Sequence, residues 1–325
     1  MVLFILRRCI QAVSVLFVMS LVVFAGVYAI GSPMDLLVDP QATREDLARA
    51  AAALGLDQPA WVQYWRFLVR AVSGDLGNSF IHGSPALGLI LERMPATFEL
   101  ALVAMLIAVL LGIPLGLWSG LAPDSISGRA IMAGSILGFS LPTFWVGLML
   151  IMVFAVQLGW LPAGGRGPTR EFLGLHLSVF SAEGWRHLIL PAANLALFKL
   201  SLIIRLTRSG TREALLQDYV RFARAKGLSS TRVVGVHVLK NILIPVVTVV
   251  GLEFGALIAF SVVTESIFAW PGMGKLLLES IGQLDRPVVV AYLLLIVVLY
   301  VGISLVVDLL YAALDPRVRL RGGAA

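Results

Sequence analysis

Charged residues and cysteine are scarce in this sequence. Only 14% of its 325 residues are charged, and Cys9 is the only cysteine. One cysteine excludes an intramolecular disulfide and any metal site built from paired thiolates. Hydrophobic residues make up 59% of the chain and the mean hydropathy is +0.93, far outside the usual composition of soluble proteins. The sequence therefore predicts an integral membrane protein.

Groups that carry catalysis are also sparse. The histidines are scattered along the chain: His82, His176, His187 and His237. No pair of them has the spacing of metal ligands, and no serine lies in a nucleophile elbow. The segment WPGMGK fails the phosphate-loop pattern, because Ala269 stands at the first glycine position and Leu276 follows Lys275. We therefore expect no catalytic residue, no metal and no cofactor in this chain.

A formal net charge of +6 could indicate a protein that binds nucleic acid. The arginines, however, lie at the ends of apolar runs, where membrane topology accounts for them better. The expected surroundings are membrane lipid, and no nucleic-acid partner is expected.

Six apolar runs are long enough to cross a hydrocarbon core of about 30 Å at ~1.5 Å per residue. They are residues 9–30, 98–117, 131–158, 187–206, 241–263 and 288–307. A cleaved signal peptide is the alternative for the first run. Its apolar part is usually shorter, and no small-x-small cleavage site follows here, so an uncleaved first span is expected. Proline at 114, 142, 191 and 245 predicts kinks in the second to fifth spans.

Lysine and arginine gather in three places: near the N-terminus, in residues 210–240, and in the C-terminal tail. With six spans, all three fall on the same side of the membrane. The segment from 31 to 94 contains more acidic than basic residues. The positive-inside rule then predicts that both termini and the basic loop are cytoplasmic.

The external segment is expected to hold two helices. The first follows Thr43 and ends at Gly55, and the second is amphipathic, with Trp61, Tyr64, Trp65 and Leu68 on one face. This aromatic face fits either the membrane interface or a periplasmic partner.

The basic loop also predicts two helices. Leu215, Leu216, Tyr219, Phe222 and Ala223 recur on one helical face, whereas the charged residues fall elsewhere: Arg212, Asp218, Arg221 and Arg224. Gly227 is expected to end this helix in the left-handed conformation. Ser229, Ser230 and Thr231 are N-cap candidates for a second helix, which runs into the apolar fifth span.

The string DYVRFARAKG, followed by His237, Asn241 and IPVVT, resembles the cytoplasmic EAA loop of binding-protein-dependent ABC importer permeases, specifically the dipeptide/oligopeptide branch. Ala223 and Gly227 match the last alanine and the glycine of that motif, and Pro245 its closing proline. Arg221 and Phe222 stand in place of its acidic residue and first alanine. Further segments similar to this branch are LGLDQP, GDLGNS, WPGMGK and YAALDPRVR, so the resemblance runs nearly end to end.

The resemblance implies an all-α integral membrane protein with the type I ABC importer permease fold: six transmembrane helices and a small helical periplasmic insertion after the first span. The implied division is a first span with the periplasmic segment (1–95), a transmembrane domain (96–312) with a coupling loop at about 209–240, and a cytoplasmic tail (313–325). The loop's first helix, 212–227, would dock into a groove of an ATPase subunit, with Ala223 burying small apolar surface there. The implied coupling residues are Leu215, Asp218, Tyr219, Arg221, Ala223, Arg224, Ala225, Lys226, Gly227 and Pro245.

The implied function is a permease subunit in the bacterial inner membrane that gives a di- or oligopeptide, or a related small solute, a passive path. The implied partners are a homologous second permease, two cytoplasmic ABC ATPases that bind ATP and Mg, and a periplasmic or lipid-anchored solute-binding protein. The chain itself would not be an enzyme. An ion-coupled secondary transporter or channel is the alternative, but it requires coupling charges or an inverted repeat, and neither is visible.

Two charges lie inside the predicted spans, Lys199 in the fourth and Glu253 in the fifth. Each lies about 18 Å into its span if the spans begin near His187 and Asn241. A lone charge at that depth costs about 2.5 to 3.5 kcal/mol, so opposite signs at similar depth predict a partnership. The pair either ties the two spans together or lines the translocation path.

Overall fold

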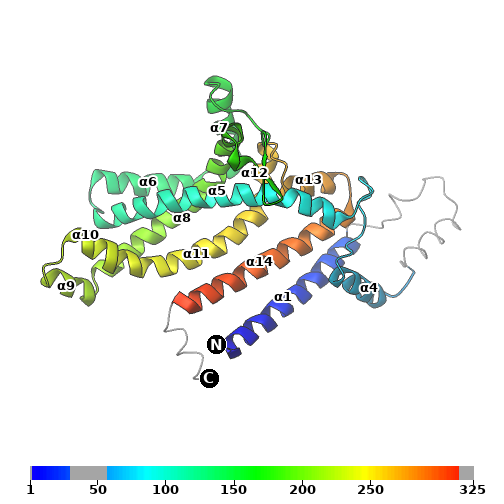
Figure 1. Cartoon of the computed structure of the whole chain (residues 1–325), viewed down its shortest axis with the longest axis horizontal. Coiled ribbons are helices and arrows are strands. Elements are labelled where there is room, and N and C mark those ends of the chain that lie inside the picture. Colours follow the sequence, from blue (N-terminus) through cyan, green and yellow to red (C-terminus); the bar gives the residue numbers. More distant parts are fainter. Residues whose placement is uncertain (1, 30–56, 315–325) are drawn as a thin grey trace. The chain divides into compact units, whose positions relative to one another are not determined.

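The computed structural model describes residues 2–29 and 57–314, which are largely helical (Figure 1). The long helices are α1 (Val2–Ala29), α5 (Ala86–Leu121), α8 (Ala182–Leu215), α11 (Leu239–Phe260) and α14 (Arg286–Leu314). Shorter ones are α4 (Ala60–Val72), α6 (Ile126–Ser140), α7 (Thr143–Leu150), α9 (Asp218–Ala225), α10 (Ser230–Arg232), α12 (Val262–Ile267) and α13 (Met273–Gly282). The expected helix at 43–55 and the tail from 315 lie outside the described residues.

Three irregular turns and one hairpin complete the described elements. The π-helical turns η1 (Ile151–Gln157) and η3 (Val233–Val238) continue α7 and α10, and η2 (Ser178–Phe180) is a 3₁₀ turn. Strands β1 (Arg170–Phe172) and β2 (Leu175–Leu177) pair antiparallel, with Glu171 opposite His176.

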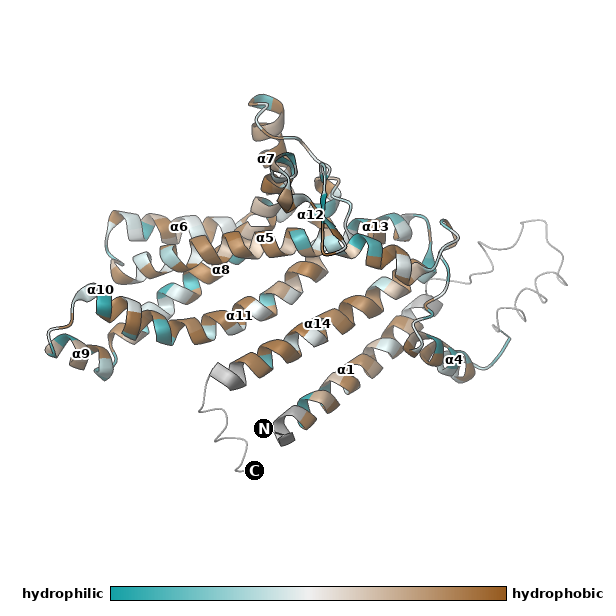
Figure 2. Cartoon of the chain, in the orientation of Figure 1, coloured by the Kyte–Doolittle hydropathy of each residue, from teal (hydrophilic) through white to brown (hydrophobic). Residues whose placement is uncertain are grey.

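In the part of the chain that the structure describes, five helical segments are long and apolar enough to cross a membrane, and much of their surface is coloured as hydrophobic in Figure 2. They are Leu6–Gly26, Ala86–Leu121, Ala182–Leu215, Ser230–Phe260 and Arg286–Leu310. The expected third span is broken, because α6 and the segment Thr143–Gln157 meet at 105°. The prediction of six spans therefore holds only if this bent pair is one span.

Pro142 accounts for the break. A proline disfavours helical backbone in the residue before it, and Leu141 is extended (φ −80°, ψ 134°) between the two helices. Pro114, Pro191 and Pro245 lie inside helices that continue through them, so of the four prolines only Pro142 coincides with a break.

The chain divides into two compact units, which are described separately. The first holds residues 93–276 with the described parts of 1–5 and 302–325. The second holds the described parts of 6–92 and 277–301.

In the first unit, α5 and α8 pack through a row of glycines. A Cβ atom added at any of three positions on α5 would lie 2.6–2.8 Å from a side-chain carbon of α8, closer than real Cβ contacts. The facing pairs are Gly112 with Ile203, Gly116 with Thr207, and Gly120 with Thr211. Spacing of four residues puts the glycines on one face, which lets the two backbones approach as small residues do between membrane helices.

In the second unit, α4 packs on α1 through aromatic side chains. The Tyr64 hydroxyl lies 2.8 Å from the Ser20 hydroxyl, and the Tyr64 ring contacts Phe17 edge-on. Trp61 and Trp65 point away, with 73% and 62% of their surface exposed. The expected helix is present, and Tyr64 lies at the edge of its aromatic face that is nearer to α1.

A loop of the second unit is fixed to the beginning of α14. The buried carboxylate of Asp285 accepts hydrogen bonds from the Ser79 hydroxyl and from the Phe80 N–H. Upstream, the Gly77 N–H and the Arg70 guanidinium bind the exposed Asp75 carboxylate and hold its pKa below the usual value. These contacts fix the conformation of the GDLGNS segment, residues 74–79, and hold it at the beginning of α14.

Candidate functional site: the basic loop and a charged span interior

One hydrophobic cluster joins the basic loop to α8 and α11. Its buried members are Ala214, Val220, Ala223, Val233, Val238, Ile242 and Val246. They come from the end of α8, from α9, from η3 and from the first turns of α11, so the short helix is held by both long ones. Burial of these apolar side chains stabilises the arrangement, at about 25 cal/mol per Å² removed from water.

The other face of α9 is exposed and mixes aromatic with charged side chains. Phe222 is 62% exposed, and the Lys226 ammonium lies 4.5 Å from the centre of its ring. Leu216 and Tyr219 are exposed beside it. The remaining exposed members of the predicted set are Asp218, Arg221, Arg224, Ala225, Lys226, Gly227 and Pro245, and Leu215 is partly buried.

The structure corrects the predicted helix at 212–227. Residues 212–215 belong to α8, the chain turns at Leu216, and an extended Gln217 (ψ 148°) precedes the new helix. Ala223 is 4% exposed and lies in the cluster. The expectation that it shares a face with Tyr219 and Phe222 and offers surface to a partner is wrong, because its face packs inside this chain.

Gly227 has the predicted left-handed backbone, with φ +76°. A Cβ added there would meet nothing within 4 Å. Within this chain, glycine is thus favoured here by its backbone conformation and not by a close neighbouring atom. Ser229 is the N-cap residue of α10, as predicted, although its side chain makes no capping hydrogen bond.

Lys199 and Glu253 form the expected ion pair between α8 and α11. Their side chains are 12% and 29% exposed. The predicted partnership across the fourth and fifth spans is confirmed, and Glu253 is the more exposed of the two.

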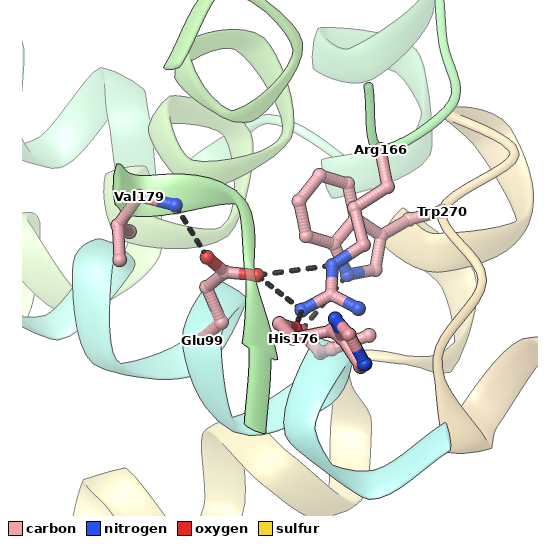
Figure 3. A network of polar contacts seen from close by, with 6 residues as sticks. Glu99, Arg166, His176, Val179 and Trp270 are labelled. Carbon is pink, nitrogen blue, oxygen red and sulfur yellow. Dashed lines mark hydrogen bonds and ion pairs between the residues drawn. The ribbon is translucent and has the colours of Figure 1, made fainter. Parts of the chain in front are cut away.

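A second buried carboxylate, Glu99, was missed from the sequence (Figure 3). It lies on α5 and binds the Arg166 guanidinium at 2.6 and 3.0 Å, and it accepts the Val179 N–H at 2.7 Å. Arg166 also donates to the His176 carbonyl at 2.7 Å. The network fixes the segment that carries β1 and β2 to α5. The sequence feature that could have indicated this site is a glutamate within an apolar run, because a charged side chain in a membrane span needs a partner.

The WPGMGK segment, residues 270–275, folds around the side chain of Glu265. Its buried carboxylate accepts the Thr97 hydroxyl at 2.7 Å, the Ser261 hydroxyl at 2.8 Å and the Lys275 N–H at 3.0 Å. A Cβ at Gly272 would collide with this carboxylate. The N-terminus of α13, where an anion binds favourably, is occupied by the protein's own side chain.

No cluster of three or more His, Cys, Asp or Glu side chains that could hold a metal ion occurs in the part of the chain that the structure describes.

Comparison with known proteins identifies the family to which the chain belongs. Residues 112–320 match the model described as "Binding-protein-dependent transport system inner membrane component", and residues 1–101 match that of the N-terminal part of such components. The chain is 42% identical to the di/tripeptide transport system permease protein DppB of Pseudomonas aeruginosa, over 97% of this chain and 98% of the relative. It is 40% identical to the oligopeptide permease protein AppB of Bacillus subtilis, with the same coverage.

A third relative is the glutathione permease protein GsiC of Escherichia coli K12, 38% identical over 98% of this chain and 99% of the relative. Among solved structures, the MetNI methionine ABC transporter matches with a TM-score of 0.55 and 17% identity, covering 70% of this chain and 96% of that one, which shows a shared fold. These similarities do not favour a secondary transporter or channel. The chain therefore belongs to the inner membrane components of binding-protein-dependent transport systems, and it is a multi-pass ABC importer permease subunit with no enzymatic role of its own.

Proposed function

We propose that this permease subunit carries di- or oligopeptides, or a closely related small solute, across the inner membrane. The support is that the relatives named above are permeases for di/tripeptides, oligopeptides and glutathione. All three solute classes contain amide bonds between amino acids, so a peptide-like solute is the simplest common substrate.

The proposed assembly pairs this chain with a homologous second permease, two cytoplasmic ATPases and a periplasmic or lipid-anchored solute-binding protein. No cofactor binds to this chain; the ATPases bind ATP and Mg. Both termini and α9 lie in the cytoplasm, in line with the basic residues of the loop.

The observation that carries the coupling proposal is the two-sided character of α9. Its inner face, with Val220 and Ala223, is locked to α8 and α11. Its outer face offers Tyr219 and Phe222 with flanking charges. A partner that holds the outer face and moves would displace both long helices, which is how a rigid link passes closure of the ATPases to the spans.

The Lys199–Glu253 pair is the proposed charged part of the translocation path. Ionisable groups inside spans generally face the interior of the bundle or water, because lipid does not solvate them. The incomplete burial of Glu253 fits a position at the edge of such a path.

Replacement of Phe222 by alanine tests the coupling proposal. Exposed aromatic anchors at interfaces often contribute 2 kcal/mol or more, so solute-stimulated ATP hydrolysis by the assembled transporter should fall about tenfold or more. Ile126→Ala is the matched control, since Ile126 is 84% exposed and lies on the same predicted side. Equal activity of Phe222→Ala and wild type would contradict the proposal.

A further inference from the structure

Five side chains form a continuous row across α6, α8 and α11, here called the cationic ladder. The guanidinium carbon of Arg205 lies 4.3 Å from the centre of the Phe139 ring. Phe139 stacks on Phe198, with 4.5 Å between ring centres and 26° between planes. The Lys199 ammonium lies 5.4 Å from the Phe198 ring and pairs with Glu253.

Arg205 points toward the middle of its span. It lies about 15 Å from the end of α8 at Leu215 and about 35 Å from its beginning at Ala182. A long cationic side chain normally extends to the nearer water interface. Arg205 instead lies on Phe139, whose ring stacks on Phe198, two turns back toward the beginning of α8. Its charge is therefore held within the span.

The charges of the ladder do not balance. Lys199 and Glu253 compensate each other, which leaves Arg205 as the surplus cation. Among the side chains that the structure describes, none gives Arg205 a hydrogen bond or an ion pair. A guanidinium that stacks on a ring keeps its in-plane N–H groups available, and their fork matches the two oxygens of a carboxylate.

Two members of the ladder are partly exposed. Phe139 is 41% exposed and Glu253 is 29% exposed. Charged groups within spans avoid lipid and generally face the bundle interior or a water-filled cavity. A passage with a surplus guanidinium and aromatic walls suits a solute that has a carboxylate and apolar parts.

We propose that Arg205, supported by Phe139 and Phe198, is a carboxylate-binding step of the translocation path that receives the free C-terminal carboxylate of the peptide. The inference rests on the proposed peptide solute and adds to it the group that the path recognises. Lys199 and Glu253 keep the neighbouring part of the path electrically neutral.

Uptake of trialanine and of trialanine amide by the complete transporter in vesicles tests this step. Arg205→Gln should lower uptake of trialanine about tenfold relative to wild type, which corresponds to about 1.4 kcal/mol. Uptake of the amide, which lacks the carboxylate, should change less than about twofold. Arg208→Gln, one turn along α8, removes the same charge outside the ladder. It should change the uptake of both peptides by the same factor. An equal loss for both peptides in Arg205→Gln would overturn the proposal.

A second measurement does not depend on the solute class. Phe139→Cys in a Cys9→Ser background should react about fivefold faster with an anionic than with a cationic methanethiosulfonate reagent, because of the nearby surplus cation. Adding Arg205→Gln should abolish the preference. If the wild-type transporter carries neither peptide, the proposed solute class is refuted but the carboxylate-binding step is not. The reagent preference then tests whether Arg205 supplies the surplus positive charge of the ladder. Absence of reaction, or a preference for the cationic reagent, would overturn it.

Discussion

At the scale of single residues, the pairing of Lys199 with Glu253 joins α8 to α11. The sequence predicted it from two opposite charges at similar depth, and the ion pair is present. Pairing alone does not separate a structural tie from a role in the path. A charge exchange does separate them.

Either neutral single variant, Lys199→Met or Glu253→Gln, should reduce the amount of protein in the membrane. Breaking this partly buried pair leaves one charge without compensation, at a cost below the ~3–5 kcal/mol typical of a fully buried pair. The double variant Lys199→Glu with Glu253→Lys restores opposite charges, so quantitative membrane immunoblots should recover to the wild-type level. In the double variant a carboxylate replaces the Lys199 ammonium that lies 5.4 Å from the Phe198 ring, so the pair stays neutral but its two charges are reversed along the proposed path, and uptake should stay low; full recovery of uptake would reduce the pair to a structural tie.

Two residues of the basic loop differ in how well their structure could be predicted from the sequence. The left-handed backbone of Gly227 was predictable, since a helix end followed by glycine has a local cause. The burial of Ala223 was not, because the α8 and α11 side chains that cover it come from distant segments. Glu99 and Glu265 were missed for a related reason: their partners, such as Arg166 and Thr97, lie far away in the sequence.

At the scale of elements, the spans were predictable and their contacts were not. Apolar runs located the five continuous helices, although α5 begins twelve residues before the predicted span. The glycine row on α5 is visible in the sequence as a four-residue repeat, but the helix it contacts is known only from the structure. The break at Leu141 follows from Pro142, whereas three other prolines leave their helices continuous.

Substitution in the glycine row should destabilise the first unit. A Cβ at Gly116 would lie 2.6 Å from the Thr207 Cβ, so Gly116→Ala should cost about 1–3 kcal/mol through overpacking. Gly134→Ala on α6 is the control, because its Cβ would meet nothing within 4 Å. The apparent Tm of the detergent-purified protein should drop for the first variant alone. Similar values for the two variants would show that α5 and α8 have room between them.

At the scale of the whole molecule, the family and the membrane location follow from sequence and comparison together. The orientation in the membrane is our proposal from the distribution of basic residues. It decides whether α9 can meet a cytoplasmic partner at all, and it can be measured without knowing the solute.

Single cysteines on opposite sides test the orientation. In a Cys9→Ser background, Ser73→Cys should react with a membrane-impermeant thiol reagent added outside, and Ser229→Cys should react only after the cells are opened. Both positions are exposed, so burial does not limit the reaction. Labelling of position 229 in sealed cells would place the basic loop outside and exclude the proposed coupling.

The central claim is that the outer face of α9 is the contact with an ATPase subunit. Phe222→Cys in the Cys9→Ser background, treated with a short bifunctional thiol and amine cross-linker in native membranes, tests it most directly. The account predicts a covalent adduct between this chain and an ATPase subunit at position 222, and none at the control Ile126→Cys, although Ile126 is more exposed than Phe222. Absence of the adduct at 222, while the cysteine remains reactive, would contradict the account.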